Sequence, residues 1–203
     1  MNYDLIAKDF DTDERIERAK KIADEIRLHI NTEHKKSALE YGCGTGLVGF
    51  QLIDCFSKLV FTDSSVGMIE QAKQKLFNLG KSKDDAIVAD FIAKMPASIS
   101  VDYIFSSLVL HHIKDTRIIL SRFYNILNSD GKLLIIDLDS DDGSFHANHS
   151  NFDGLNGFDH SELINLSADI GFRKISAKTF YYGKRRVNDK DVPYSLFILD
   201  AMK

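Results

Sequence analysis

The stretch Glu40-Tyr41-Gly42-Cys43-Gly44-Thr45-Gly46 places three alternating glycines between two apolar segments of the chain. Glycines lack a Cβ atom, so the backbone can turn sharply there and a ligand can lie against the main chain. A helix that starts just after such a turn directs its free N–H groups toward that ligand. The pattern predicts a strand at 37–41, a ligand-binding turn, and a helix carrying Leu47, Val48, Phe50, Leu52 and Ile53.

Working outward from this turn, short apolar runs alternate with helical patterns, which is typical of a parallel sheet covered by helices on both faces. The predicted parallel strands are 37–41, 59–62, 86–89, 103–108 and 132–137. Helical spacing of apolar residues predicts a helix at 16–30 capped by Asp11 or Thr12, one that stops at Gly80, and one that ends before Gly131. Asp159 with Glu162 predicts a capping box, for a helix that stops at Gly171.

The end of the chain has a different pattern. Residues 172–182 and 194–202 both read as strands with no helix between them, so we expect them to pair as an antiparallel hairpin. The predicted fold is therefore α/β: a Rossmann-like three-layer sandwich with a seven-stranded, mostly parallel sheet that ends in this hairpin. The one long irregular segment, 139–158, has the length of a functional or mobile loop.

Asp63 is the acidic partner of the glycine turn. It lies 21 positions after Gly42, at the predicted end of the second strand, where a carboxylate can accept both hydroxyls of a ribose. The alternative is that Asp63 caps the helix beginning at Val66, a role that Ser64 or Ser65 could fill equally well.

Two cofactor classes fit the glycines. Residues 44–49 match the dinucleotide pattern G-x-G-x-x-G, whereas residues 42–46 match a shorter pattern that follows the carboxylate of Glu40. A carboxylate beside a pyrophosphate would repel it, but it would attract the ammonium of a methionyl group, directly or through water. Glu40 therefore favours S-adenosylmethionine (SAM) over NAD.

Residues 39–138 resemble the class I SAM-dependent methyltransferases, particularly the type 11/12-like branch that acts on small molecules. Four motifs match in order: 39–46, 61–65 with 68–69, 89–91, and 102–108 with 110–113. The resemblance implies that Asp63 holds the ribose and that Met68 and Phe91 flank the adenine. It also implies that Asp90 accepts a hydrogen bond from the adenine amino group. The cofactor-binding residues implied are Glu40, Gly42, Cys43, Gly44, Gly46, Asp63, Ser64, Met68, Asp90, Phe91 and Ser106.

Some of these residues have simpler interpretations. Asp90 could cap a turn, and Asp102 precedes its strand and is expected to be structural. Tyr41 stands where many family members carry an aliphatic or small residue, which does not disturb the motif. The chain is expected to form one methyltransferase domain, with an N-terminal helical cap at 1–36, a SAM-binding core at 37–138, and an acceptor-side loop, helix and hairpin at 139–203.

The acceptor site is less clearly marked. His111 and His112 follow the fourth strand and could orient the acceptor or take its proton, but a structural role is favoured, so the catalytic residue is unassigned. His146, His149 and His160 lack metal-ligand spacing, which favours a solvated loop and no metal. The N-terminal aromatic cluster fits either a lid over the acceptor or simple packing. Its residues are Tyr3, Ile6 and Phe10. Tyr181 and Tyr182 could close the pocket, though sheet packing is favoured, and the basic run 184–186 is expected to be a solvated hairpin tip.

Charge and composition limit the classes of partner that the protein is expected to bind. The net charge is −4 with a pI near 6.0, and the basic residues are scattered among carboxylates, which disfavours nucleic acids and anionic membranes. A small neutral or cationic acceptor is expected. Two cysteines and a polar N-terminus favour the cytoplasm, and nothing indicates the oligomeric state. Two further functions stay open: a non-catalytic SAM-fold binding protein and an NAD-dependent oxidoreductase.

Overall fold

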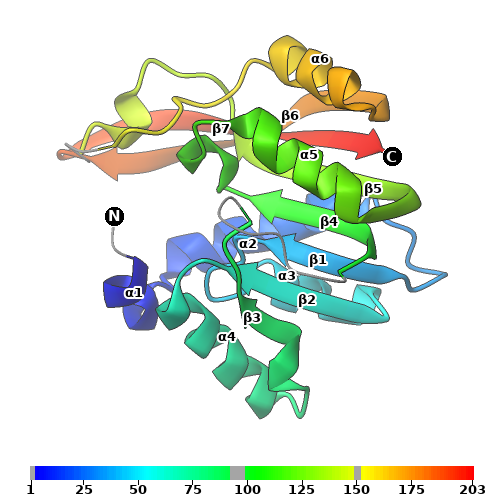
Figure 1. The fold of residues 1–203 in the computed structure, drawn as a ribbon. Helices are drawn as coiled ribbons and strands as arrows, with labels where there is room; N and C mark the ends of the chain where they lie inside the picture. Colours follow the sequence, from blue (N-terminus) through cyan, green and yellow to red (C-terminus); the bar gives the residue numbers. More distant parts are fainter. Residues whose placement is uncertain (1–2, 92–98, 149–151) are drawn as a thin grey trace.

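The computed structural model describes residues 3–91, 99–148 and 152–203. Within them, seven strands form one sheet in the order β3-β2-β1-β4-β5-β7-β6 (Figure 1). Strands β1 to β5 are parallel, and β7 runs antiparallel to both of its neighbours. This sheet confirms the predicted Rossmann-like architecture. The bounds are β1 Ser37–Tyr41, β2 Lys58–Asp63, β3 Ala86–Val88, β4 Val101–Ser107, β5 Leu127–Leu138, β6 Arg173–Val187 and β7 Lys190–Met202.

Helices cover both faces of this sheet, so the domain has three layers (Figure 1). Buried side chains of α2, α3 and α4 pack on one face, and those of α5 and α6 pack on the other. The short helix α1 lies beside α4 at the N-terminal end of the chain. The helix bounds are α1 Tyr3–Ile6, α2 Asp13–Arg27, α3 Gly49–Leu52, α4 Val66–Asn78, α5 Thr116–Ile126 and α6 His160–Ile170.

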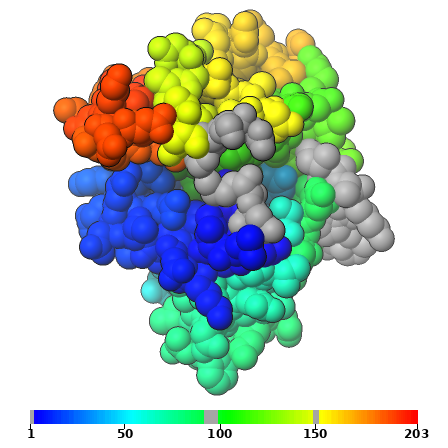
Figure 2. Space-filling view, turned by 90° about the vertical axis from the view of Figure 1, so that its left-hand side faces the viewer, coloured from blue at the N-terminus to red at the C-terminus, as the bar shows by residue number. Residues whose placement is uncertain are grey.

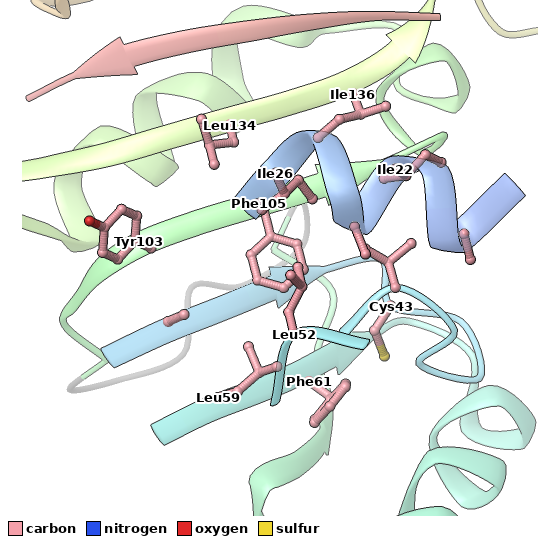
Figure 3. Close-up of a cluster of buried hydrophobic side chains, with 14 of the residues drawn as sticks. Ile22, Ile26, Cys43, Leu52, Leu59, Phe61, Tyr103, Phe105, Leu134 and Ile136 are labelled. Carbon is pink, nitrogen blue, oxygen red and sulfur yellow. The ribbon is translucent and has the colours of Figure 1, made fainter. Parts of the chain in front are cut away.

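Figure 3 shows the core between α2 and the sheet. Ile22 and Ile26 of α2 point toward the strands, where Phe105 and Leu134 meet them, and Leu52 of α3 fills the space below. All these side chains are fully or almost fully buried. The amphipathic pattern that predicts α2 is therefore explained by burial of one helix face against the sheet.

Polar caps set the helix starts where the sequence places them. The Thr12 hydroxyl accepts from Arg15 N at the start of α2, and the Asp159 carboxylate accepts from Glu162 N at the start of α6. Ser65, with its hydroxyl accepting from Met68 N, caps α4. A side-chain acceptor satisfies a backbone donor that has no partner within the helix. Thr12 and Asp159 are thus confirmed as caps, and α4 is capped by Ser65.

Two predicted helices are shorter than expected. The helix after the glycine turn covers only Gly49–Leu52 and is followed by a 3-10 turn at Ile53–Cys55. It is short because β2 begins at Lys58, which leaves no room for further helical turns. Helix α5 ends at Ile126, and Leu127 pairs with Val101 as the first residue of β5. Apolar periodicity alone did not separate the end of that helix from the start of the strand.

The C-terminal hairpin is longer than predicted. Its two strands are joined by Asn188 and Asp189, which have φ values of 46° and 62°. Two successive residues with positive φ are typical of a tight two-residue hairpin turn, and Asn and Asp tolerate that conformation. The extension places the basic run 184–186 inside β6 instead of at the tip. Among the described residues, no helix is both long and apolar enough to cross a bilayer.

Candidate active site

A cavity of about 370 Å³ opens at the carboxyl ends of β1, β2, β3 and β4. Each strand contributes the residues that directly follow or end it. They are Gly42, Cys43 and Gly44 after β1, Asp63 and Ser64 after β2, Ala89 and Asp90 after β3, and Ser107, Leu108 and Val109 after β4. In open α/β sheets this edge, where the strand order reverses, is the usual ligand site. The structure therefore brings most of the residues predicted to bind a cofactor together around one cavity.

The glycine turn approaches the loop after β4 very closely. Gly42 has a φ of +67°, and a Cβ atom there would lie 2.4 Å from Cγ2 of Val109. A side chain at position 42 would therefore strain the backbone and collide with the wall of the cavity. Gly44 faces into the same space, near the ring of Phe10 and the sulfur of Met68. Among the described residues Gly46 does not line the cavity; it packs against Phe50 and shapes the turn.

Glu40 is a buried carboxyl group in the wall of this cavity. Its side chain is 1% exposed, and within the described structure its Oε2 atom has no hydrogen-bond partner. Burial raises the pKa of the Glu40 carboxyl well above its usual range. A buried acceptor without a partner is rare and often marks the place of a ligand.

The same carboxyl explains why residue 49 is glycine. A Cβ atom on Gly49 would lie 2.2 Å from Oε2 of Glu40 and 2.5 Å from the Phe61 ring. The glycine that completes the apparent dinucleotide pattern at 44–49 is thus required by Glu40. The structure removes the main feature of the sequence that suggested a pyrophosphate site.

Asp63 connects the glycine turn to the start of α4. Its two carboxylate oxygens accept hydrogen bonds at 2.8 Å, Oδ2 from Gly44 N and Oδ1 from Ser65 N. Burial raises the pKa of the Asp63 carboxyl despite these bonds. Since Ser65 supplies the cap of α4, the alternative role for Asp63 is not needed. Asp63 instead lines the cavity together with Ser64 and Met68.

Two residues named by the resemblance lie elsewhere. Phe91 is fully buried below the cavity, with its ring 5.2 Å from that of Tyr41, and does not line it. Ser106 is also buried, and its hydroxyl donates to Tyr41 O at 2.9 Å, which ties β4 to β1. The lining residues after β4 are instead Ser107, Leu108 and Val109. Leu108 adopts a φ of 58°, which turns the chain into the cavity wall. Asp90 is an exposed residue of the lining.

The N-terminal segment closes the cavity from the outside. Tyr3 and Phe10 line it, and Ile6 does not, among the residues described. Asp4 holds this segment against α4 by accepting from Ser65 Oγ at 2.6 Å and Gly67 N at 2.8 Å, while Asp11 pairs with Lys75 at 2.7 Å. Figure 2 shows the N-terminal part of the chain, in blue, below the end of the hairpin, in orange, and below the loop residues 139–148 and 152–158, in yellow-green to yellow.

A second cavity, of about 580 Å³, adjoins the first on its outer side. The two share Tyr3, Phe10, Arg15, Arg18, Leu108 and His112. The far side of the second cavity is formed by Phe145, His146, Phe152 and Arg185. Arg15 and Arg18 were missed by the sequence analysis, because within the pattern of α2 they look like ordinary solvated positions.

His111 and His112 have different environments. The buried His111 ring places Nδ1 2.6 Å from Oδ1 of the fully buried Asp137, and it lines the second cavity. His112 lies 3.0 Å from the hydroxyl of Tyr3, measured from Nε2, and lines both cavities. Asp137 was not among the predicted residues, since it reads as the last position of a buried strand.

The loop residues are more ordered than expected. His146 is buried and stacks on Phe152 at 3.7 Å between ring centroids, and His160 lies 2.6 Å from Asp139, so neither belongs to a solvated loop. His149 lies outside the described residues. Across 3–91, 99–148 and 152–203, no group of three acidic, histidine or cysteine side chains is placed to hold a metal. Asp102 accepts from Ser37 N and Oγ, which is the structural role predicted for it.

Of the hairpin residues, the basic run differs from its prediction, whereas the two tyrosines take the sheet-packing role that was favoured for them. Arg185 is half-buried; it donates to Phe145 O at 3.1 Å, and its guanidinium lies 4.6 Å from the centre of the Phe145 ring. The basic run is therefore not simply a solvated tip. Tyr182 is 79% exposed and lines neither cavity, whereas Tyr181 packs beside Tyr194.

Known proteins are similar to this chain in sequence and in fold. A family model described as a methyltransferase domain matches residues 39–133. An uncharacterized methyltransferase of Schizosaccharomyces pombe is 29% identical over 136 residues, which are 62% of this chain and 48% of that protein. Phosphoethanolamine N-methyltransferase 1 of Arabidopsis thaliana is 28% identical over 153 residues, covering 73% of this chain and 31% of that protein.

Among solved structures, phosphoethanolamine N-methyltransferase 2 of Haemonchus contortus in complex with S-adenosyl-L-methionine has a TM-score of 0.72. The match covers 91% of this chain and 52% of that chain at 18% identity, a level that shows the fold. The chain belongs to the class I SAM-dependent methyltransferases. It spans about half the length of the yeast relative and about a third of the Arabidopsis one.

Proposed function

We propose that this protein binds SAM in the first cavity and transfers its methyl group to a small-molecule acceptor in the second. The observation that carries the proposal is the Oε2 atom of Glu40, a buried acceptor without a partner beside a glycine turn. SAM carries an ammonium and a sulfonium, and positive charge near this carboxyl would compensate the cost of burying it in charged form.

The lining residues fit the parts of SAM in sequence along the sheet edge. In the proposed arrangement, the backbone of Gly42, Cys43 and Gly44 lies along the methionyl part, with Glu40 beneath it. Asp63 receives the ribose hydroxyls, and Met68 with Asp90 flanks the adenine. Phe91 and Ser106 support the walls from the core and do not touch the cofactor.

SAM, when bound, supplies an activated methyl group on sulfur, and the protein must align the acceptor with the S–CH₃ bond and exclude water. Tyr3 and Phe10 cover the junction of the two cavities, so they would shield this path. His111 is the proposed general base, because Asp137 accepts from Nδ1 and leaves Nε2 as the basic nitrogen.

Several features support a small acceptor. The second cavity has about 580 Å³ and is bounded by the N-terminal segment, the described parts of the loop at 145–148 and 152–154, and the hairpin, which suits a metabolite. The Arabidopsis and Haemonchus relatives are named for a small phosphorylated amine. A single domain over 1–203 and a cytoplasmic location belong to the same proposal, and limited proteolysis and cell fractionation would test them.

One experiment separates this function from its alternatives. Calorimetry with S-adenosylhomocysteine and with NAD, followed by transfer of labelled methyl groups from SAM to a pool of metabolites, distinguishes three cases. Binding and turnover support a methyltransferase, whereas binding without turnover in any pool supports a non-catalytic SAM-fold protein. Binding of NAD alone would support an oxidoreductase and overturn the proposal.

A further inference from the structure

Three arginines from two distant parts of the sequence meet at the second cavity. Arg15 and Arg18 lie three residues apart on α2, and Arg185 comes from β6. The charge of Arg18 lowers the pKa of Arg15, and the charges of Arg18 and Arg15 lower that of Arg185, each in addition to the larger effect of burial. Three positive groups are therefore held close together and partly removed from water.

Each of these guanidinium groups has a neutral group among its partners. Arg15 donates to Phe10 O at 2.8 Å and lies 4.1 Å from the centre of the Phe10 ring. Arg185 is held in a similar way by the carbonyl and ring of Phe145. Arg18 donates to the hydroxyl of Tyr194 at 3.3 Å. Aromatic faces and carbonyls fix the direction of an arginine without neutralising it.

The carboxylates that line this cavity lie at its exposed edge. Glu14 is 3.7 Å from Arg18, but its side chain is 61% exposed. Asp153 is 82% exposed and pairs with Lys114 at 2.7 Å. Water screens the pair of Lys114 with Asp153, because both side chains are exposed. Glu14 offsets part of the charge of Arg18, whose side chain is 15% exposed, and this leaves one carboxylate beside three arginines. The potential inside the cavity is therefore positive, although the net charge of the chain is −4.

We infer that the acceptor carries an anionic group, a phosphate monoester or a carboxylate, which binds to Arg15, Arg18 and Arg185. This inference rests on the proposed function, because it takes the second cavity to be the acceptor site. Guanidinium groups present paired donors that match the oxygens of either anion. The inference differs from the sequence-based expectation of a neutral or cationic acceptor.

The anionic group would also orient the acceptor. His111 lines the same cavity, so an acceptor anchored at the arginines can extend its reacting atom toward His111 and the first cavity. Fixing one end of a substrate raises the effective concentration of the other end at the reaction centre. Loss of the anchor should therefore affect acceptor binding more than cofactor binding.

The test uses matched probes with and without the anionic group. Phosphoethanolamine, ethanolamine and inorganic phosphate are titrated by calorimetry into the protein, both saturated with S-adenosylhomocysteine and free of it. The carboxylate arm uses β-alanine. We expect phosphoethanolamine or β-alanine to bind and ethanolamine not to bind. Arg15→Gln and Arg185→Gln should each weaken that binding about tenfold or more, and Arg185→Lys should restore part of it.

The control variant is Arg117→Gln, which removes an exposed arginine that pairs with Asp169 on the surface of α5 and α6. It should leave anion binding unchanged. Failure of every anion to bind in both states of the protein would overturn the inference, as would equal binding by the arginine variants. If S-adenosylhomocysteine binds while the anions do not, only this inference fails. If anions bind but S-adenosylhomocysteine does not, the proposed function fails while the anion site stands.

Discussion

Oδ1 of Asp137 lies 2.6 Å from Nδ1 of His111 and joins the end of β5 to the loop after β4. The same carboxylate accepts from His111 N at 3.2 Å and from Leu138 N at 2.8 Å, so its orientation is fixed by several bonds. A carboxylate can only accept, so the facing ring nitrogen carries the proton and the other nitrogen is basic. This contact turns an ordinary loop histidine into a candidate base beside the second cavity.

Asp137→Asn should lower kcat by about 100-fold to 10,000-fold, the usual contribution of a positioned base. The amide can donate to Nδ1, which would move the ring proton to Nε2 and block proton uptake there. SAM affinity, measured by calorimetry, should stay within about twofold of that of the unmodified protein, since Asp137 lines neither cavity.

The control for that variant is Asp139→Asn. Asp139 forms a pair with His160 at the same distance of 2.6 Å, but neither residue is among the described residues that line the two cavities. The kcat of the Asp139→Asn variant should be nearly the same as that of the unmodified protein. If Asp137→Asn keeps full kcat in a folded protein, His111 is not the base, and transfer proceeds by positioning alone.

Asp63→Asn should weaken SAM binding by about 1.5–3 kcal/mol, which is roughly 10-fold to 100-fold in Kd. The carboxylate already accepts from Gly44 N and Ser65 N, so an amide with one acceptor oxygen cannot serve both of them and the ribose. Asp63→Ala would also remove those two hydrogen bonds, so a loss of SAM affinity could not be separated from a loss of folding stability. Asp84→Asn, an exposed position far from the cavities, is the charge-matched control. Equal Kd values for both variants would remove Asp63 from the ribose site.

Gly42→Ala should abolish detectable SAM binding, because its Cβ would collide with Val109 in the cavity wall. Gly80→Ala is a matched control: its φ of +66° is almost that of Gly42, but a Cβ atom there would meet nothing within 4 Å. Both variants should lose about 1–2 kcal/mol of stability from backbone strain, measurable by chemical denaturation. Only Gly42→Ala should lose binding in calorimetry. Retained SAM binding in Gly42→Ala would contradict the proposed place of the methionyl part.

Glu40→Gln should change how stability depends on pH. Burial raises the pKa of the Glu40 carboxyl in the folded protein, so as the pH rises the unfolded chain releases this proton first. The stability associated with the protonated form is fully present below about pH 4 and is lost as the pH rises through the folded pKa.

The free energy of unfolding of the unmodified protein should therefore fall relative to that of Glu40→Gln over the range from about pH 5 upward, by at most about 1.4 kcal/mol per pH unit. Asp63 shifts in the same direction but is present in both proteins, so its contribution cancels. Urea denaturation across this range measures the difference. A difference that stays constant with pH would show that Glu40 titrates as an ordinary carboxyl.

The elements that depend on residues close together in the chain could be predicted from the sequence. Alternation of apolar runs and helical stripes predicted β1 to β5 and the crossover helices, and the caps at Thr12 and Asp159 lie where their side chains indicated. Residue types that bend or cap the backbone act over a few positions, so their effect can be read directly. The glycine turn and Asp63 were predicted for the same reason, because strand ends of a parallel sheet meet at one edge.

Which side chain faces the cavity was decided by the tertiary structure. Successive residues of a strand point to opposite sides, so a difference of one position separates Ser106, which bonds to Tyr41 O, from Ser107, which lines the cavity. Phe91, three positions after the end of β3, packs in the core against Tyr41. The contact of His111 with Asp137 and the meeting of Arg15 with Arg185 join residues far apart in the chain. The sequence alone determined where the candidate cofactor site lies, whereas the packing of distant elements decided which side chains line it, which carboxylate faces His111 and which arginines meet beside it.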